Sequence, residues 1–325
     1  MNRVRAAVVG VGSFGRNHAR VISQLEEAEL AAIVDTDWAR GQSLGQQYGC
    51  PAYSDIEAIF GKVDAAIVAS PTETHADLAG RLLEAGVDVL VEKPIASTSP
   101  DGGRLTRIAE ERGRILQVGH LERFNPAVSA LEQALTVPLF FEVHRLSVFT
   151  PRSLDIDVVL DLMIHDLDLV LSCVKESPVE IHAAGISVLS PKVDIANVRL
   201  VFPSGCIANL TASRVSTEQV RKLRLFQPGE YISVDYGRQE AIRLAVAPNK
   251  ESPISFEPLF VQKAEPLRLE LESFFHCVRT RSRPRVDGFQ ATDALRVAES
   301  ILDKIAKHAE VVANTIRRAG QSSLS

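Results

Sequence analysis

The first 120 residues alternate short apolar, β-branched runs with segments of helical periodicity. Each apolar run has the length of a strand buried on both faces, and each helical segment is long enough to cross back over a sheet. Strands separated by crossover helices form a parallel sheet covered on both sides. We therefore predict a doubly wound Rossmann domain over residues 1–120, with strands at 4–10, 30–35, 63–70, 88–94 and 115–120.

The pattern changes after Asn125-Pro126. A helical segment at 126–135 and a run at 139–147 lead to several alternating runs joined by tight turns such as Pro203-Ser204-Gly205. Consecutive strands joined in this way form an antiparallel sheet. We predict an α+β domain over residues 121–325, with an open-faced, mostly antiparallel sheet, helices on one side and two closing helices near 267–280 and 291–310. Strands at 198–202 and 206–215 would expose apolar side chains on an uncovered face, which predicts a homodimer or homotetramer.

Composition narrows the class of protein. The 325 residues carry a formal net charge of −5, with 46% hydrophobic and 24% charged residues, as in ordinary globular proteins. This charge gives no overall basic surface for nucleic acid. No segment offers the roughly 20 charge-free apolar residues of a membrane span, and the N-terminus enters a strand pattern directly. We expect a cytoplasmic protein whose four widely spaced cysteines, Cys50, Cys173, Cys206 and Cys277, are free and buried.

A glycine-rich motif follows the first strand. Residues 10–15, Gly10-Val11-Gly12-Ser13-Phe14-Gly15, fit G-x-G-x-x-G and open a helix, the arrangement that lets backbone N–H groups meet a pyrophosphate. Asp35 ends the second strand, where a carboxylate can bind a ribose 2′-hydroxyl and repel a 2′-phosphate. A glycine-rich turn without a ligand is the alternative. The combination favours NAD over NADP, and Arg40 leaves the strictness of that choice open.

Two further loops follow strand ends at the edge where open α/β sheets bind ligands. The first is Ser70-Pro71-Thr72, with His75 one turn into the next helix, and the second is Glu92-Lys93-Pro94. These residues complete the predicted cofactor site. Lys93 is either a solvated end residue or a positive charge held by the following proline beside a reacting oxygen. Proline also allows a cis peptide bond at this position.

Residues 160–169, LDLMIHDLDL, place three aspartates and a histidine among apolar residues. On an α-helix Asp161, His165 and Asp168 share one narrow face, while apolar side chains cover most of the remaining surface. This pattern predicts a buried helix with a polar stripe facing a cavity. A self-satisfied Asp161–His165 pair in the core is the alternative to a reactive site. We predict no metal, because no recognisable motif supplies a third ligand.

Together these motifs resemble the family of glucose-fructose oxidoreductase and inositol 2-dehydrogenase over essentially the whole chain. The resemblance implies an NAD-dependent enzyme whose first domain binds the cofactor and whose second domain supports sugar or polyol oxidation. It also implies a catalytic group of Lys93, Asp161 and His165 that contacts the substrate. Two departures are visible: Met163 stands where the family commonly has glycine, and residues 119–124 replace a more usual Asn/Arg-rich segment.

Three longer stretches, residues 119–126, 144–169 and 194–216, are similar to the subgroup that oxidises carbon 3 of UDP-N-acetylglucosamine. That resemblance implies a 3-oxo nucleotide sugar that is then aminated for lipid A synthesis. The second domain and its entry supply cations for a diphosphate, at Arg123, Arg145, Arg152, Arg214 and Arg224. A solvated surface arginine is the alternative for each. We single out Arg123 and Arg152 as substrate-binding residues, Arg152 foremost.

For the reaction, His165 is our candidate for general base, because a neutral imidazole accepts a proton near physiological pH. Lys93 would stabilise the developing alkoxide, and Asp161 would orient His165 or share its proton. Lys93 and His165 could also exchange roles. A dehydrogenase of a free sugar or polyol such as inositol is a second hypothesis. A non-catalytic NAD-binding regulatory protein is a third, and the presence of all three residues argues against it.

Overall fold

The computed structural model describes residues 3–150, 156–246 and 254–322, which form two compact units. Unit 1 comprises Met1–Phe124 and Ala264–Leu295, and unit 2 comprises Asn125–Lys263 and Arg296–Ser325. The sequence predicts a second domain that covers all of residues 121–325, whereas Ala264–Leu295 groups with unit 1 because its helix packs on the parallel-sheet unit. No helix in the described ranges has the length and apolar character needed to cross a membrane.

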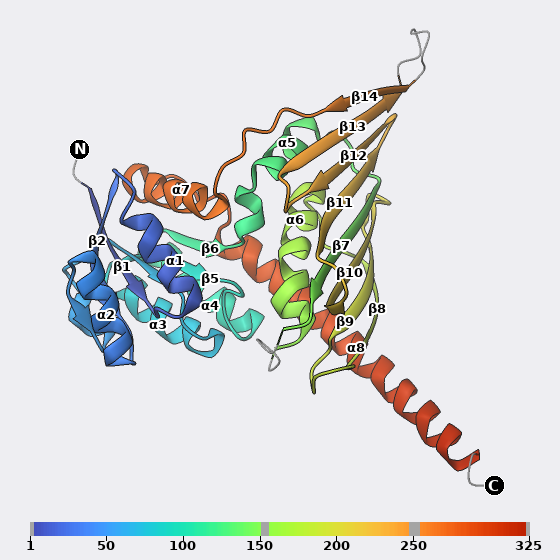
Figure 1. The fold of residues 1–325 in the computed structure, drawn as a ribbon, viewed down its shortest axis with the longest axis horizontal. Helices are drawn as coiled ribbons and strands as arrows, with labels where there is room; N and C mark the ends of the chain where they lie inside the picture. The colour runs from blue at the N-terminus through green and yellow to red at the C-terminus, as the bar shows by residue number, and fades with distance from the viewer. Residues whose placement is uncertain (1–2, 151–155, 247–253, 323–325) are drawn as a thin grey trace. The chain divides into compact units, whose positions relative to one another are not determined.

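Unit 1 is built on a six-stranded parallel sheet in the order β3-β2-β1-β4-β5-β6 (Figure 1). The strand order reverses around β1, as in a doubly wound fold, so the predicted Rossmann sheet is confirmed. Its central strands are apolar on both faces because helices cover both sides. The strands are β1 (Val4–Val9), β2 (Ala28–Val34), β3 (Ala52–Tyr53), β4 (Ala65–Val68), β5 (Asp88–Glu92) and β6 (Leu116–Gly119).

Crossover helices follow the strands of this sheet. Asp37 caps the second by accepting a hydrogen bond from the Arg40 backbone N–H, and Gly49 ends it in the left-handed conformation. Helix α7 packs on α1 and β1, adding Phe274 and Phe275 to the core of unit 1. The helices are α1 (Ser13–Ile22), α2 (Trp38–Tyr48), η1 (Ile56–Ile59), α3 (Thr72–Glu84), α4 (Ser99–Glu111), η2 (Leu121–Phe124), α7 (Pro266–Thr280) and the start of α8 (Gly288–Ser322).

Unit 2 is an eight-stranded sheet in the order β14-β13-β12-β11-β7-β10-β9-β8, antiparallel except where β7 pairs with β10. Helices α5 and α6 lie along one of its faces (Figure 1), which confirms the predicted architecture. The strands are β7 (Phe140–Val148), β8 (Glu180–Ile186), β9 (Ile195–Val201), β10 (Ile207–Ser216), β11 (Val220–Gln227), β12 (Glu230–Asp235), β13 (Glu240–Val246) and β14 (Ile254–Pro258). The helical elements are α5 (Pro126–Ala134), η3 (Val159–Met163) and α6 (Ile164–Val174).

The two faces of this sheet differ in polarity. Val198, Leu200 and Leu210 point into the core of unit 2, and the alternate positions of β9 and β10 carry polar residues such as Arg199 and Thr211. The expectation that these strands would expose apolar side chains is therefore wrong for most of their length. Strict alternation sends nearly every apolar residue to the covered face.

Candidate functional site

A pocket of about 590 Å³ opens in unit 1 at the carboxyl ends of β1, β2 and β4. Its lining brings together most of the cofactor residues that the sequence predicted, with several that the motif did not indicate. The predicted residues that line it are Gly10, Gly12, Ser13, Phe14, Asp35, Ser70 and Pro71; the others include Thr36, Arg40, Ser54, Thr74, Leu78 and Arg81. Thr36 and Ser54 lie one or two positions beyond strand ends, which the strand pattern could have indicated, whereas Arg40 lies in α2 and Thr74, Leu78 and Arg81 lie in α3.

Three glycines shape this pocket in different ways. A Cβ at Gly15 would lie 1.9 Å from the Gly10 carbonyl oxygen, so this glycine lets α1 approach the first turn. Gly10 has φ +83, and a Cβ at this position would lie 2.8 Å from the Ser70 backbone, so only glycine permits this turn. A Cβ at Gly12 would meet no protein atom within 4 Å, and Gly12 lines the pocket. The structure thus leaves open space at the helix N-terminus, where the pyrophosphate of a dinucleotide fits.

Asp35 is buried at the end of β2 and accepts four hydrogen bonds. Two come from the backbone N–H groups of Val11 and Asp37, both at 2.8 Å, and two come from the Arg40 guanidinium at 3.1 and 2.8 Å. Burial acts to raise the pKa of Asp35, but these hydrogen bonds and the charge of Arg40 lower it. The carboxylate is therefore charged and fixed in the pocket wall, in the position suited to a ribose hydroxyl.

His75 connects the two predicted loops. Its Nε2 lies 2.9 Å from the Ser70 carbonyl oxygen and its Nδ1 lies 2.9 Å from the Pro94 carbonyl oxygen, and the residue is buried. Both acceptors are carbonyl oxygens, so both contacts are hydrogen bonds when the imidazole is doubly protonated. His75 does not line the pocket; it ties the Ser70 loop to the loop that carries Lys93. The Lys93–Pro94 peptide bond is cis.

Glu92 and Lys93 occupy neighbouring positions at the end of β5. The Glu92 carboxylate lies 2.7 Å from Nε2 of His18 on α1. Burial acts to raise the pKa of Glu92, but the hydrogen bond with His18 and the positive charges of His18, Lys93 and His75 lower it. Thr72, the remaining predicted cofactor residue, begins α3. The predicted loop residues thus divide into pocket-lining groups and groups that hold the loops together.

Asp161 lies in a π-helix, and His165 lies in the first turn of the α-helix that follows it. The Ile164 backbone N–H donates to the Val159 carbonyl oxygen five residues before it, so residues 159–163 form a π-helix that leads into α6. The spacing of 100° per residue used for the sequence prediction therefore applies only from Ile164 onward. π-helical turns are rare in proteins, and those that do occur are often found at functional sites. Asp161 and His165 are half-buried, whereas Asp168 is fully buried within α6.

Asp166, the aspartate of this stretch that lies off the predicted polar face, has a structural partner. Its carboxylate accepts two hydrogen bonds from Arg145 on β7, at 2.7 and 2.8 Å, and the Arg145 guanidinium lies over the Tyr236 ring. The Arg145 and Asp166 side chains are 5% and 2% exposed. This ion pair fixes α6 on the sheet, so Arg145 is engaged inside unit 2 rather than presented to a substrate.

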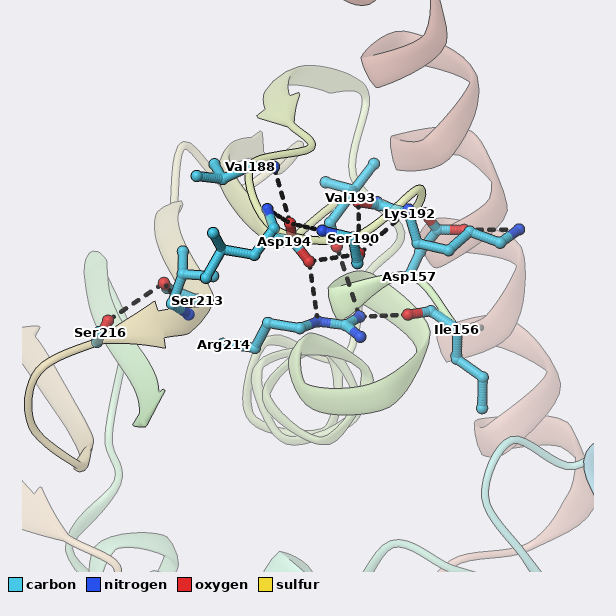
Figure 2. A network of polar contacts seen from close by, with 12 residues as sticks. Ile156, Asp157, Val188, Ser190, Lys192, Val193, Asp194, Ser213, Arg214 and Ser216 are labelled. Atoms are coloured by element: carbon cyan, nitrogen blue, oxygen red, sulfur yellow. Dashed lines mark hydrogen bonds and ion pairs between the residues drawn. The ribbon is translucent and has the colours of Figure 1, made fainter. Parts of the chain in front are cut away.

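Arg214 on β10 is also engaged internally, as Figure 2 shows. It donates to the Ile156 carbonyl oxygen and pairs with Asp194, whose carboxylate accepts hydrogen bonds from the turn at residues 188–190. The Val193 backbone N–H donates to the Asp157 carboxylate at 2.9 Å. These contacts anchor the chain directly before the π-helix that carries Asp161.

The other predicted cations have different surroundings. Arg224 is half-buried and pairs with Glu142 at 3.0 Å. Arg123 is buried in η2, and Arg152 lies outside the described residues. Arg145, Arg214 and Arg224 therefore serve as partners of carboxylates, which the sequence could not show because each partner is distant in the chain. Within the described ranges, no three His, Cys, Asp or Glu side chains are grouped to hold a metal ion. All four cysteines are free, with Cys50 only half-buried.

Comparison with known proteins gives consistent matches across both units. Residues 4–120 match the family model described as "Oxidoreductase family, NAD-binding Rossmann fold", and residues 141–227 match the GFO/IDH/MocA C-terminal domain. The UDP-N-acetylglucosamine 3-dehydrogenase of Acidithiobacillus ferrooxidans is 38% identical over 237 residues, 73% of this chain and 75% of that protein. A solved structure of that enzyme covers 95% of this chain and 99% of its own, with a TM-score of 0.89 and 33% identity.

A second group of relatives acts on another class of molecule. The inositol 2-dehydrogenase of Rhizobium meliloti is 24% identical over 326 residues, 95% of this chain and 98% of that protein. Up to 95% of the chain thus matches named dehydrogenases, with higher sequence identity to the nucleotide-sugar enzyme than to this inositol enzyme.

Proposed function

This chain belongs to the GFO/IDH/MocA family of NAD-binding oxidoreductases, and from that premise we propose that it oxidises carbon 3 of UDP-N-acetylglucosamine to the 3-oxo nucleotide sugar. The observation that carries this choice is the 38% identity to an enzyme with that printed activity, supported by a structural match over 95% of the chain. A 3-oxo nucleotide sugar is a substrate for amination, in keeping with a role in supplying a lipid A precursor.

Bound NAD supplies the hydride acceptor, while the protein supplies binding, orientation and proton transfer. The pocket of unit 1 would hold the dinucleotide, with its pyrophosphate at the N-terminus of α1 and a ribose at Asp35. His165 takes the hydroxyl proton, Lys93 stabilises the charge that develops on the oxygen, and Asp161 orients the acceptor of the proton. If Lys93 and His165 exchange these roles, the hydroxyl proton passes to Lys93 instead, and the overall reaction is the same.

Forked hydrogen bonds from arginine suit the diphosphate of a nucleotide sugar. Arg145, Arg214 and Arg224 pair with carboxylates inside unit 2, and we assign diphosphate binding to Arg123 and Arg152, the two arginines that the sequence analysis singles out. This assignment predicts that truncating Arg152 to alanine raises KM for the nucleotide sugar and leaves NAD affinity unchanged.

The proposal is tested by a substrate panel followed through NADH absorbance. UDP-N-acetylglucosamine, UDP-glucose, free N-acetylglucosamine and myo-inositol would each be offered with NAD and with NADP, and the product identified by NMR. We expect the highest kcat/KM with UDP-N-acetylglucosamine and NAD, and a carbonyl at carbon 3. A higher kcat/KM for inositol would replace this proposal with the second candidate, a polyol dehydrogenase, which the end-to-end match to inositol 2-dehydrogenase favours.

We also propose self-association through the outer face of the unit 2 sheet. This face carries a broad hollow whose lining mixes Phe140 and Phe226 with Glu142, His144 and Arg199. Aromatic residues and arginine are enriched in subunit interfaces. Light scattering on the wild type and on Phe226→Glu tests this: a dimer or tetramer that the substitution weakens supports it, and a monomeric wild type contradicts it. Free cysteines and the use of NAD support a cytoplasmic location.

A further inference from the structure

Four polar side chains from four elements meet inside unit 1. They are His18 of α1, Glu92 at the end of β5, Gln117 of β6 and Glu270 of α7. His18 and Glu92 are in contact at 2.7 Å, and the Gln117 side chain donates to the Glu270 backbone carbonyl at 3.2 Å. His18, Gln117 and Glu270 are at most 1% exposed, and the Glu92 side chain is 16% exposed. None of the sequence motifs contains Gln117 or Glu270, so this cluster is a product of the return of α7 to unit 1.

The Glu270 carboxyl group stands out within this cluster. Its Oε1 is buried and has no hydrogen-bond partner among the described residues. A carboxylate in such a position is disfavoured, because burial removes its hydration and no hydrogen bond to Oε1 replaces it. Burial raises the pKa of Glu270 well above its ordinary value, and the negative charge of Glu92 raises it further. Both influences favour the protonated, neutral form of Glu270.

Glu92 behaves in the opposite way although it is also largely buried. It has His18 as a hydrogen-bond partner, and the charges of His18, Lys93 and His75 favour its ionised form. Two carboxyl groups whose surroundings drive them to different protonation states are typical of functional sites. Of the two carboxyl groups in this cluster, Glu92 is therefore the one whose surroundings favour a negative charge, and it is next to Lys93 in the chain.

We propose that Glu270 is a positioning residue that stays protonated, so that one carboxylate, Glu92, lies among the cations of this cluster. Ionised Glu270 would place a second negative charge near Glu92. His18 lies on the helix that follows the glycine-rich turn, and Glu92 precedes Lys93, so this change disturbs both the cofactor pocket and the loop that carries Lys93. The titratable and polar groups that face Glu92 and Glu270 are His18 of α1, His75 of α3, Lys93 after β5 and Gln117 of β6. The catalytic consequence of a change at Lys93 rests on the proposed dehydrogenase activity. The protonation of Glu270 does not depend on that activity.

The first test is infrared spectroscopy of the full-length protein, titrated from neutral to alkaline pH. A protonated carboxylic acid has a C=O stretching band that carboxylates lack. We expect this band in the wild type at neutral pH, its loss in Glu270→Gln, and its disappearance at lower pH in Glu92→Gln, because the charge that holds the proton on Glu270 is gone. Absence of the band in the wild type, or its full retention in Glu270→Gln, overturns the assignment.

The second test measures NAD affinity across the same pH range by calorimetry. Above the pKa of Glu270, wild-type affinity should fall by at most tenfold per pH unit, the limit for linkage to one proton. Glu270→Gln, which mimics the neutral acid, should lack this fall. An identical pH dependence in the two proteins overturns the positioning role. If Glu270→Gln does not fold, the infrared shift between the wild type and Glu92→Gln still decides the coupling of the two carboxyls. Neither measurement involves a sugar, so failure of the substrate panel leaves both results interpretable.

Discussion

The two units use charged residues for different purposes. In unit 1 the Asp35–Arg40 pair lines a pocket; the Asp35 side chain is only 3% exposed, but Arg40 is 38% exposed, so the pair still presents a charged group to a ligand. In unit 2 the Arg145–Asp166 pair is almost wholly buried and holds a helix to a sheet. Hydrogen-bond geometry is nearly the same in both pairs. Exposure, which follows from the fold, separates a ligand-binding pair from a structural one.

Breaking the buried pair of unit 2 should give the largest effect. We expect Arg145→Ala to lower the free energy of unfolding by about 3–5 kcal/mol, because Asp166 would remain buried without its partner. The matched control is Arg224→Ala, whose half-buried pair with Glu142 should be worth at most about 1 kcal/mol. Urea titration of both variants measures the difference. Equal losses would mean that burial does not separate these pairs.

Replacing a proposed catalytic residue should affect turnover rather than stability. We expect Lys93→Ala and His165→Ala each to lower kcat by about 100-fold or more, about 2.7 kcal/mol, with NAD affinity nearly unchanged. Exposed residues of the same type, Lys192→Ala and His182→Ala, serve as controls and should keep wild-type turnover. Normal turnover in His165→Ala would remove that residue from the mechanism.

The Asp194 carboxylate gives unit 2 a dependence on acid pH. Burial acts to raise its pKa, but the Ser190 hydroxyl and three backbone N–H groups lower it from 3.8 to about 2. Because folding lowers the pKa of Asp194, its ionised form stabilises the folded state at pH values above the unfolded-state pKa. This contribution is lost as the pH falls from about 4 toward about 2. We expect Asp194→Asn to cost about 2 kcal/mol near neutral pH and progressively less in acid. A cost independent of pH would contradict the role of the charge.

The smallest predicted effect is on the binding of the cofactor and on the preference for NAD over NADP. Asp35→Ala should weaken NAD binding by about tenfold or more, the worth of a hydrogen bond to a charged group. It should also narrow the preference for NAD over NADP, since the carboxylate that repels a 2′-phosphate is gone. Asp37→Asn, which keeps the cap of α2, is the control for local disruption. Calorimetry with both cofactors tests this, and an unchanged preference would assign the discrimination to another residue.

Unit 1 was largely predictable because its signals are local. The turn at Gly10–Gly15 and the acid at Asp35 lie at fixed offsets from strand ends, and the structure gathers them in one pocket. Unit 2 was predictable in architecture but not in the use of its charges. Arg145 and Asp166 are 21 residues apart and come together only through the packing of α6 on β7.

Two features had no signal in the sequence pattern. The π-helix at Val159–Met163 replaces the expected regular helix, since an apolar run with scattered aspartates does not distinguish bonds four residues apart from bonds five apart. The buried Glu270 lies in a predicted helix that otherwise has the periodicity of an ordinary amphipathic element. Its environment depends on α7 returning to unit 1, which requires long-range contacts.

Hydride transfer from carbon 3 of UDP-N-acetylglucosamine is the central claim, and isotope labelling tests it most directly. The substrate would carry deuterium at carbon 3, and the reduced cofactor would be analysed by mass spectrometry. The account predicts deuterated NADH and slower turnover than with the unlabelled sugar. Unlabelled NADH from this substrate would contradict it.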